Sequence, residues 1–399
     1  MALLSSQQHP ILVVGGGIGG LTAALALGRL GWPVRVLEEA SEFGAIGYGI
    51  QLGPNVFHMF ERLGLSDAVL AKAIEPPALV MLDALDGKEV ARVPTGESFR
   101  RRFKYPYIVT HRIDLHHILL DACRAVPNVA LESSSAVTGW EDHGDTVEVR
   151  TADGRVIKGV AVIGADGLGS RVRAQLLNEG APRMIGYVAH RTIVPIDQVP
   201  AGVLRREVVL WGGPGFHIVH YPLRHDTLFN IVAVFRTPTF AEKGDAGAYK
   251  AEVEANYRDA HPVMKALLEL MDLRHRWAIS DRDPIRKWHR GRVGLLGDAA
   301  HPTLQSLAQG ACMAIEDGVC LADLIAAEQG DFDEAFRRYE TARLIRTARV
   351  QLESRDLWPF YHAEGIARDV RNATCATWSQ DHMFRCLGWL YDGFSLPTA

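Results

Sequence analysis

The sequence predicts a mixed α/β (α+β) fold, in which a Rossmann-like unit is interleaved with a sheet-rich second unit and followed by a helical C-terminal region. Three observations lead to this prediction. An apolar run, a glycine-rich turn, a helix-like stretch and a second apolar run follow one another within 11–39. Two later apolar runs, 160–164 and 292–296, continue into an Asp within two residues. Between them, 186–235 consists mainly of short strand-like segments.

The opening segment has the pattern of a nucleotide-binding unit. Residues 11–14, ILVV, are typical of a buried parallel strand, and Gly15, Gly17 and Gly20 follow with the spacing G-x-G-x-x-G. Gly15 permits a tight turn, Gly17 lets a pyrophosphate approach the backbone, and Gly20 lets the next helix pack closely on the strand. That helix, predicted over 21–30, would offer free N–H groups to phosphate.

An acidic residue completes this unit. A second strand, 34–37, ends at Glu38, at about the distance expected for a carboxylate that accepts ribose hydroxyls. The motif therefore predicts an adenine dinucleotide site, but by itself it leaves FAD and NAD open. A glycine-rich turn in another α/β protein is the alternative interpretation.

Length and composition limit the classes of protein. A chain of 399 residues has room for two or three folded units, and 48% hydrophobic with 23% charged residues is ordinary for a globular protein. A net charge of −4 gives no indication of a nucleic-acid partner. The five cysteines are scattered without a C-x-x-C pair, which argues against a disulfide framework or a metal site and fits a reducing compartment.

The N-terminal region does not resemble a targeting segment. Residues 1–10 carry no basic residue before their apolar portion, so they do not predict a secretory signal. The uncharged run 11–28 is nearly long enough for a membrane span, but its glycines fit a phosphate loop better. The sequence therefore predicts no membrane span and a cytoplasmic location.

Further elements follow from periodicity and turn residues. Residues 107–123 predict a strand and then a helix, with Asp114 near the helix start and with His111, His116 and His117 at the surface or the helix cap. Three short segments predict an antiparallel meander: 129–131, 146–151 and 155–159. The other predicted elements are strands at 79–82 and 89–93, and helices at 56–63, within 247–275, at 310–329 and at 336–354.

Two further stretches belong with the opening motif. They are Gly164–Arg173, GADGLGSRVR, and Gly294–Pro302, GLLGDAAHP. In this order and spacing, the three stretches resemble the signatures of the single-component FAD-dependent aromatic hydroxylases of the para-hydroxybenzoate hydroxylase type. The resemblance extends over about the whole chain.

The resemblance implies a set of cofactor contacts. Asp298 would accept hydroxyls of the flavin's ribityl chain, and the following segment, which includes Ala311, would present a helix N-terminus to the flavin. Asp166 would lie near the cofactor, and Arg112 would contact FAD. An ion pair between Arg112 and Asp114 is the alternative. NADH or NADPH would act as a transient reductant, since the chain has no second G-x-G-x-x-G unit.

Two segments carry polar side chains that could select a substrate. In the predicted strand FHIVHYPL, His217, Val219 and Tyr221 share one face, so His217 and Tyr221 are expected to point at one ligand. Gln305 stands where many relatives have proline, and it adds a polar group beside the flavin. The pairing of FHIVHYPL with AHPTLQ resembles the 3-hydroxybenzoate 6-hydroxylases. A sheet face whose polar groups are satisfied within the protein is the alternative for the His and Tyr.

The implied reaction is a monooxygenation with O₂ as co-substrate. 3-Hydroxybenzoate would be hydroxylated para to its hydroxyl, by way of a flavin C4a-hydroperoxide, to give 2,5-dihydroxybenzoate (gentisate). His217 would act as base, Gln305 as hydrogen-bond partner of the hydroxyl, and Tyr221 would orient the carboxylate or the ring. The alternatives are a salicylate 1-hydroxylase that releases CO₂, a 6-hydroxynicotinate 3-monooxygenase, and a flavin-binding protein without oxygenation.

The motifs divide the chain into three parts. Segments 1–75, 100–180 and 276–350 are expected to form a discontinuous FAD-binding domain, and 76–99 with 181–275 a substrate-binding domain with a mixed β-sheet. The tail, 351–399, is rich in aromatics and is expected to serve packing or a subunit contact. A small aromatic acid is the expected partner. The oligomeric state stays open, although a homodimer is common in the family.

Overall fold

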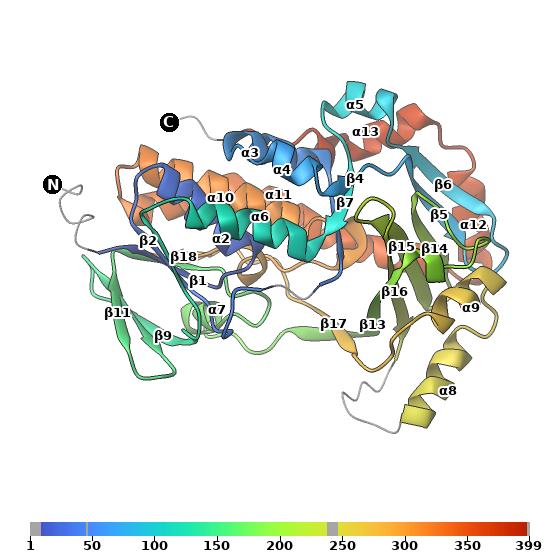
Figure 1. Cartoon of the computed structure of the whole chain (residues 1–399), viewed down its shortest axis with the longest axis horizontal. Coiled ribbons are helices and arrows are strands. Elements are labelled where there is room, and N and C mark those ends of the chain that lie inside the picture. The colour runs from blue at the N-terminus through green and yellow to red at the C-terminus, as the bar shows by residue number, and fades with distance from the viewer. Residues whose placement is uncertain (1–8, 45–46, 238–245, 397–399) are drawn as a thin grey trace.

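The computed structural model describes residues 9–44, 47–237 and 246–396, drawn in colour in Figure 1. The prediction about a secretory signal concerns residues 1–10, most of which lie outside the described residues. Within the described ranges, no helix is long and apolar enough to cross a membrane. The two large sheets and their helices form two adjoining regions, which lie side by side in Figure 1.

The glycine motif belongs to a six-stranded sheet with the order β18-β19-β12-β1-β2-β8. Neighbouring strands are parallel except at the edge pair β18–β19, as predicted for a Rossmann-like unit. The carboxyl ends of β1, β2, β12 and β19 therefore meet at one edge of the sheet. The strands are β18 (His289–Arg290), β19 (Val293–Leu295), β12 (Ala161–Gly164), β1 (Ile11–Val14), β2 (Val34–Leu37) and β8 (Val129–Glu132).

The assignment of 129–131 to an antiparallel meander is wrong. β8 pairs in parallel with β2 and forms the edge of the six-stranded sheet. The period of a short strand does not say which neighbour it joins, and here the preceding helix α6 (Arg112–Arg124) returns the chain to this edge. The meander consists instead of β9 (Val137–Asp142), β10 (Val147–Thr151) and β11 (Val156–Gly159).

Helices pack on this sheet in one hydrophobic core. α2 (Ile18–Arg29) lies against α6 and against α10 (Gly310–Ala327), and α11 (Phe332–Tyr361) runs along α10 (Figure 1). Cys312 and Cys320 on α10 are buried in this core as free thiols. α11 extends beyond both ends of the predicted helix 336–354, and it crosses the predicted domain boundary at 350.

The second region is built on a seven-stranded sheet with the order β17-β13-β16-β15-β14-β5-β6. α8 (Ala246–Asn256) and α9 (Pro262–Glu269) cover one face, where they pack on Phe216 and Ile218 among others. His217, Val219 and Tyr221 point to the opposite face, as the alternation predicted. The strands are β17 (Trp277–Asp281), β13 (Arg183–Pro195), β16 (Leu228–Arg236), β15 (Phe216–Leu223), β14 (Val208–Gly213), β5 (Ala78–Asp83) and β6 (Glu89–Pro94).

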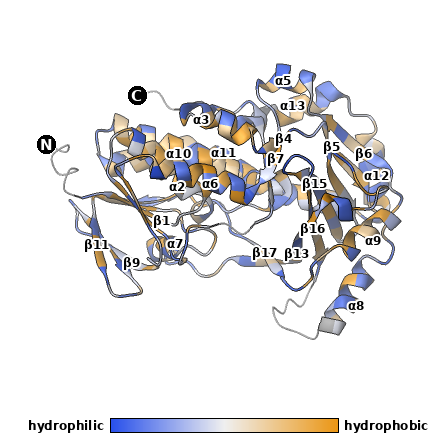
Figure 2. Cartoon of the chain, in the orientation of Figure 1, coloured by the Kyte–Doolittle hydropathy of each residue, from blue (hydrophilic) through white to orange (hydrophobic). Residues whose placement is uncertain are grey.

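A small sheet and the C-terminal helices connect the two regions. The small sheet has the order β3-β7-β4, with β3 (Gly49–Leu52), β7 (Ile108–His111) and β4 (Ala73–Ile74). Figure 2 shows hydrophobic residues along α10 and along the strands of the larger sheet. The remaining helices are α3 (Phe57–Arg62), α4 (Ser66–Leu70), α5 (Glu97–Phe103), α7 (Arg171–Leu177), α12 (Gly365–Cys375) and α13 (Gln380–Tyr391).

Candidate active site

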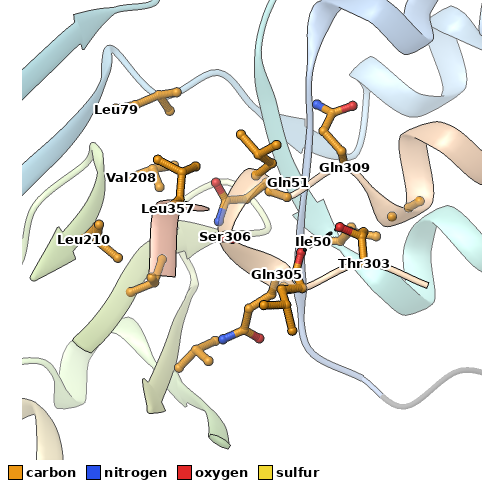
Figure 3. A pocket seen from close by; sticks show the side chains of 18 of the residues that line it. Ile50, Gln51, Leu79, Val208, Leu210, Thr303, Gln305, Ser306, Gln309 and Leu357 are labelled. Carbon is orange, nitrogen blue, oxygen red and sulfur yellow. Dashed lines mark hydrogen bonds between the residues drawn. The ribbon is translucent and has the colours of Figure 1, made fainter. Parts of the chain in front are cut away.

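A cavity of about 650 Å³ lies between the carboxyl edge of the parallel sheet and the inner face of the seven-stranded sheet. Figure 3 shows part of its wall. Leu79, Val208 and Leu210 come from the large sheet, Leu357 from α11, and Gln305 from the loop before α10. A mostly apolar cavity with a few converging polar groups is typical of a small-molecule site.

Each of the three motif glycines is required for a different structural reason. Gly15 has a φ of +105°, and a side chain there would collide with the Ala165 carbonyl. A side chain at Gly20 would collide with the Gly15 carbonyl, so this glycine lets α2 approach β1. Gly17 instead lines the cavity, and a Cβ there would meet nothing within 4 Å. No side chain caps α2, which begins at Ile18, so its first N–H groups are open to a phosphate.

Glu38 lies against the glycine loop. Its two carboxylate oxygens accept hydrogen bonds from the Gly16 N–H at 2.7 Å and the Ala40 N–H at 2.9 Å. A carboxylate held at this position can still accept from hydroxyls on its open side, because each oxygen has two lone pairs. The placement is compatible with the predicted ribose contact.

The placement of His116 at the surface or the helix cap is wrong. Its imidazole is buried, and Nε2 donates to the Gly16 carbonyl at 2.8 Å, because α6 packs directly on the glycine loop. Burial lowers the pKa of His116. The expectation holds for the other two histidines, since His111 caps α6 by accepting from the Ile113 N–H and His117 is exposed.

A second uncapped helix end faces the same cavity. Gly310 and Ala311 open α10 and line the cavity, and no side chain caps this helix. Asp298, three residues after the end of β19, also lines it and is exposed toward it. Desolvation by the surrounding protein raises the pKa of Asp298, and His301 and Arg112 oppose that rise. A hydroxyl that donated to this carboxylate would stabilise its charged form.

Arg112 and Asp166 differ in their relation to the cavity. Arg112 lines it, while Asp114 pairs with Arg224 at 2.8 Å, so the alternative ion pair between Arg112 and Asp114 is wrong. Asp166 does not line the cavity, and its carboxylate accepts from the Ser170 hydroxyl at 2.5 Å and the Arg171 N–H at 2.8 Å. It thereby holds the start of α7 beneath the loop that carries Ala165 and Gly167, both in the lining.

A buried ionic cluster supports the Asp298 loop from behind. Asp317 on α10 accepts from the Gly297 N–H at 3.1 Å, and it contacts His301 Nε2 at 2.6 Å and Arg343 Nε at 2.7 Å. Burial raises the pKa of Asp317, but His301 and Arg343 outweigh this effect and hold it at about 2. His301 does not line the cavity, which agrees with a structural role. The sequence assigned no role to Arg343.

The predicted substrate residues come together in the other half of the cavity. His217, Tyr221 and Gln305 all line it, although Gln305 comes from a distant part of the chain. Gln305 Oε1 accepts from Arg191 Nη2 at 2.9 Å. A guanidinium has only donors, so Gln305 must turn its carbonyl oxygen toward Arg191, which leaves its NH₂ group for a ligand.

Arg191 is the main site residue that was missed from the sequence. It lies on β13, in the cross-strand row with Val232 and Val219, and faces the cavity with them. Burial lowers its pKa, but a guanidinium keeps its charge in proteins. Among the described residues no carboxylate forms an ion pair with it. An arginine within the otherwise apolar strand VAHRTIV was the available signal.

His217 is held by a residue of the C-terminal tail. His217 Nδ1 lies 2.8 Å from His362 Nε2, and its own Nε2 has no partner among the described residues. Burial lowers the pKa of His217 well below its ordinary value. Burial raises the pKa of Tyr221, so its phenol is neutral.

The tail does more than packing. Leu357, Phe360 and Tyr361 line the cavity, and the Tyr361 hydroxyl donates to the Ser306 carbonyl at 2.9 Å. This role was missed because the predicted helix ends at Ser354, one turn short of the cavity. The helix continues through Pro359 to Tyr361.

These features fit FAD. Two uncapped helix ends, the open backbone at Gly17 and the Asp298 carboxylate face one continuous cavity, and they suit a pyrophosphate, a flavin and a ribityl chain. The sequence profile of the family described as "FAD binding domain" matches residues 8–353. The chain belongs to this family of FAD-binding proteins.

Among characterised relatives, the chain is similar to two enzymes named 3-hydroxybenzoate 6-hydroxylase. That of Polaromonas naphthalenivorans (strain CJ2) is 44% identical over 382 residues, which cover 96% of this chain and 95% of the relative. That of Klebsiella oxytoca is 40% identical over 380 residues, covering 95% and 96%.

Solved structures have the same fold. Klebsiella pneumoniae HpxO complexed with FAD and uric acid superposes with a TM-score of 0.84 at 25% identity, covering 97% of this chain and 98% of that one. A salicylate hydroxylase substrate complex gives a TM-score of 0.80 at 22% identity, covering 97% and 96%, and shows likeness of fold alone.

Proposed function

We propose that this protein is an FAD-dependent monooxygenase that uses NADH or NADPH and O₂ to convert 3-hydroxybenzoate to 2,5-dihydroxybenzoate (gentisate). One observation carries the choice of substrate class. A half-buried cation, Arg191, and the polar groups of Gln305, His217 and Tyr221 surround a single apolar volume. This set suits a small aromatic ring that bears an anionic group and a phenol. The names of the two relatives agree with it.

We assign the cofactor to one end of this cavity. Gly17, Arg112, Asp298 and Ala311, which line the cavity, would contact it, and Glu38 would accept ribose hydroxyls. Gly15, Gly20 and Asp166 would act indirectly, by shaping the turn and the loop around it. When bound, FAD would accept two electrons from the nicotinamide and, once reduced, activate O₂. The division into FAD-binding and substrate-binding segments belongs to the same proposal.

Ionisation of the substrate phenol raises the electron density of the ring carbon that is to be hydroxylated. A phenol has a pKa of about 10, and a histidine below 6.5 is a weak acceptor, so the proton transfer is uphill by at least about 5 kcal/mol without other help. The Gln305 amide N–H and the Arg191 charge supply that help, at about 1.5–3 kcal/mol for each hydrogen bond to a charged group. His217 Nε2 would accept the proton.

The remaining residues of the cavity would orient the substrate and exclude water. Tyr221 would orient the substrate's carboxylate or ring from the same strand, four residues after His217. Leu79, Val208, Leu210 and Leu357 make the wall apolar, which keeps water from the reacting ring carbon. An apolar wall without fixed donors also leaves the para carbon free to approach the cofactor.

The test is the consumption of NADH, NADPH and O₂ by the FAD-loaded protein with three acids in turn. 3-Hydroxybenzoate should stimulate both consumptions with stoichiometric product. Salicylate and 6-hydroxynicotinate test the other two hydroxylase activities, since each would release CO₂. Stimulation by none of them, with the flavin still reducible, would favour a flavin-binding protein without oxygenation.

We expect a homodimer and a cytoplasmic location, and light scattering and cell fractionation test them separately. Neither affects the assignment of the cavity.

A further inference from the structure

His362 lies where the long helix of the tail meets the substrate half of the cavity. It follows the last residue of α11 and forms the C-cap of that helix, with its N–H donating to the Trp358 carbonyl at 3.1 Å. Its imidazole is buried and lies edge to edge with that of His217, with ring centroids 5.0 Å apart and an angle of 24° between the planes. The end of α11 therefore places His362 against His217, the imidazole that lines the cavity.

The 2.8 Å contact between the two imidazoles links their tautomers. Only one proton can lie between His217 Nδ1 and His362 Nε2. If His217 carries it, His217 Nε2 is unprotonated and accepts from a ligand in the cavity; if His362 carries it, His217 Nε2–H donates instead. His362 thus decides whether His217 faces the cavity as an acceptor or as a donor.

Burial opposes a positive charge on both imidazoles, but the surroundings of His362 oppose it less than those of His217. The C-terminal end of the 30-residue α11 is the negative end of the helix dipole. The ring of Tyr187 stacks on His362 at 4.9 Å and 11°, and an aromatic face attracts a cation. Arg371 donates to the carbonyls of Phe360 and Tyr361 at the same helix end, but its own charge is paired with Asp83 at 2.8 Å.

We propose that His362 is a positioning residue that takes the Nδ1 proton of His217 when the substrate phenol gives its proton to His217 Nε2. The phenol O–H bond and the His217 Nδ1–H bond break, and N–H bonds form at His217 Nε2 and His362 Nε2. The products are a phenolate and an imidazolium on His362, so charge and protons balance. The inference rests on the proposed function, since it requires a phenolic substrate.

The test compares variants of the FAD-loaded protein. His362→Phe and His362→Met both remove the acceptor, and two are made because one of them can fail to fold. His362→Gln keeps a hydrogen-bond acceptor near the position of Nε2 but cannot take a proton, so it separates hydrogen bonding from proton transfer. His190→Phe removes another buried imidazole, which bonds the Tyr249 hydroxyl at 2.7 Å on the far face of the sheet, and is the matched control.

The readouts separate proton transfer from folding. Flavin reduction by NADH and the KM for 3-hydroxybenzoate should stay within about twofold in all variants. The rate of gentisate formation should fall at least about tenfold in His362→Phe, His362→Met and His362→Gln, because none of them can take the proton. This loss stays below the effect of removing the base itself, which is typically about 10²–10⁴-fold. The ultraviolet band of bound 3-hydroxybenzoate should show less phenolate in all three.

Four outcomes would overturn the inference. Gentisate formation within twofold of wild type in His362→Phe or His362→Met removes His362 from the reaction. Formation within about threefold of wild type in His362→Gln alone shows that His217 needs only a hydrogen-bond acceptor there. Losses in all three variants with flavin reduction also impaired indicate a structural role only. A wild-type protein that makes no dihydroxybenzoate defeats the proposed function, and the relay with it; in the first three outcomes the wild type still makes gentisate.

Discussion

Arg191 shows how one side chain sets the chemistry of another. By donating to Gln305 Oε1, it fixes which end of the amide faces the cavity, and it brings a charge that no described carboxylate neutralises. The sequence predicts Gln305 as a partner of the substrate hydroxyl, and the contact with Arg191 adds that Gln305 has its N–H group to donate. An anionic, phenolic ligand would satisfy both groups at once.

Replacing Arg191 by Met should raise the Kd for 3-hydroxybenzoate about 10- to 100-fold, because a hydrogen bond to a charged group contributes about 1.5–3 kcal/mol. The perturbation of the flavin spectrum on titration measures this Kd. Arg191→Lys should lose less, since it keeps the charge. As a control, Arg206→Met removes a surface arginine that pairs with Asp226. An unchanged Kd in Arg191→Met would contradict the role of this cation.

Replacing Gln305 by Glu should slow gentisate formation at least about tenfold while flavin reduction continues. The substitution keeps the shape and the contact with Arg191, but a carboxylate has no N–H for the phenolate and repels its charge. Rapid mixing of the reduced protein with O₂ and substrate measures the step. Equal product yield from both proteins would show that Gln305 does not donate to the substrate.

The three side chains predicted to contact the substrate all line the cavity. His217 and Tyr221 were singled out because they share one face of a strand, and Gln305 because many relatives have proline at its position. Arg191 and His362 were missed because their roles depend on contacts between segments far apart in the chain. No local pattern records that His362 meets His217, 145 positions away.

At the scale of elements, different glycines of the β1–α2 turn serve folding and ligand binding. Gly20 is required by the contact between α2 and the Gly15 carbonyl, whereas Gly17 leaves open space toward the cavity. The sequence placed all three glycines in one motif, and only the structure distinguishes their functions.

Gly17→Ala should fold as the wild type does but bind FAD at least about tenfold more weakly, a loss of about 1.4 kcal/mol, because the added methyl stands where phosphate approaches. Its φ of −76° suits alanine. Gly20→Ala should instead destabilise the apoprotein, since the methyl collides with backbone. Flavin content and urea unfolding of the apoproteins measure the two effects. Equal destabilisation by both substitutions would contradict this distinction.

Strands and helices were mostly predicted, and the errors have physical causes. β8 was assigned to the wrong sheet because pairing partners of a short strand are set by the tertiary fold. The predicted helix ends too early at Ser354, since α11 continues to Tyr361 and accommodates Pro359 in its last turn, where the proline removes only one N–H donor.

At the scale of the whole molecule, the cavity is assembled from the N-terminal motif, the large sheet and the tail. Asp83 joins the last two, since it pairs with Arg368 at 2.7 Å and Arg371 at 2.8 Å on α12. Burial opposes the charge of Asp83, but Arg368, the Asn372 amide and the Leu85 N–H outweigh it and lower the pKa of Asp83 to about 2. The tail is thereby fixed to the sheet whose inner face lines the cavity.

Asp83→Asn should destabilise the protein by about 3 kcal/mol, because Arg371 is buried and would keep no charged partner. It should also divert reducing equivalents to H₂O₂, since α11 and α12 hold the apolar wall. Thermal unfolding and peroxide release measure these effects. Asp86→Asn, at the more exposed end of the same turn, is the control. A stable Asp83→Asn protein with full coupling would contradict this role.

Buried histidines should make the fold sensitive to acid. Burial lowers the pKa of His190 and of His362 to about 4, and that of His220 to about 3. The folded state then binds fewer protons than the unfolded state below about pH 6.5, so stability is full above that pH and is lost as the pH falls toward 4.

At pH 5.5 the three histidines together should lower the free energy of unfolding by about 4 kcal/mol relative to pH 7.5. Urea unfolding at the two pH values measures the difference. His190→Phe should reduce the pH dependence by about a third. Equal stability at both pH values would mean that these imidazoles are protonated in the folded protein.

The most direct measurement is the identity of the product formed from 3-hydroxybenzoate by the FAD-loaded protein with NADH and O₂. Chromatography separates gentisate from 2,3- and 3,4-dihydroxybenzoate, and a parallel reaction with salicylate tests for catechol. The arrangement of Arg191, Gln305 and His217 predicts gentisate from the first acid and no catechol from the second. Catechol from salicylate, with 3-hydroxybenzoate left unchanged, would contradict the assignment of the substrate cavity.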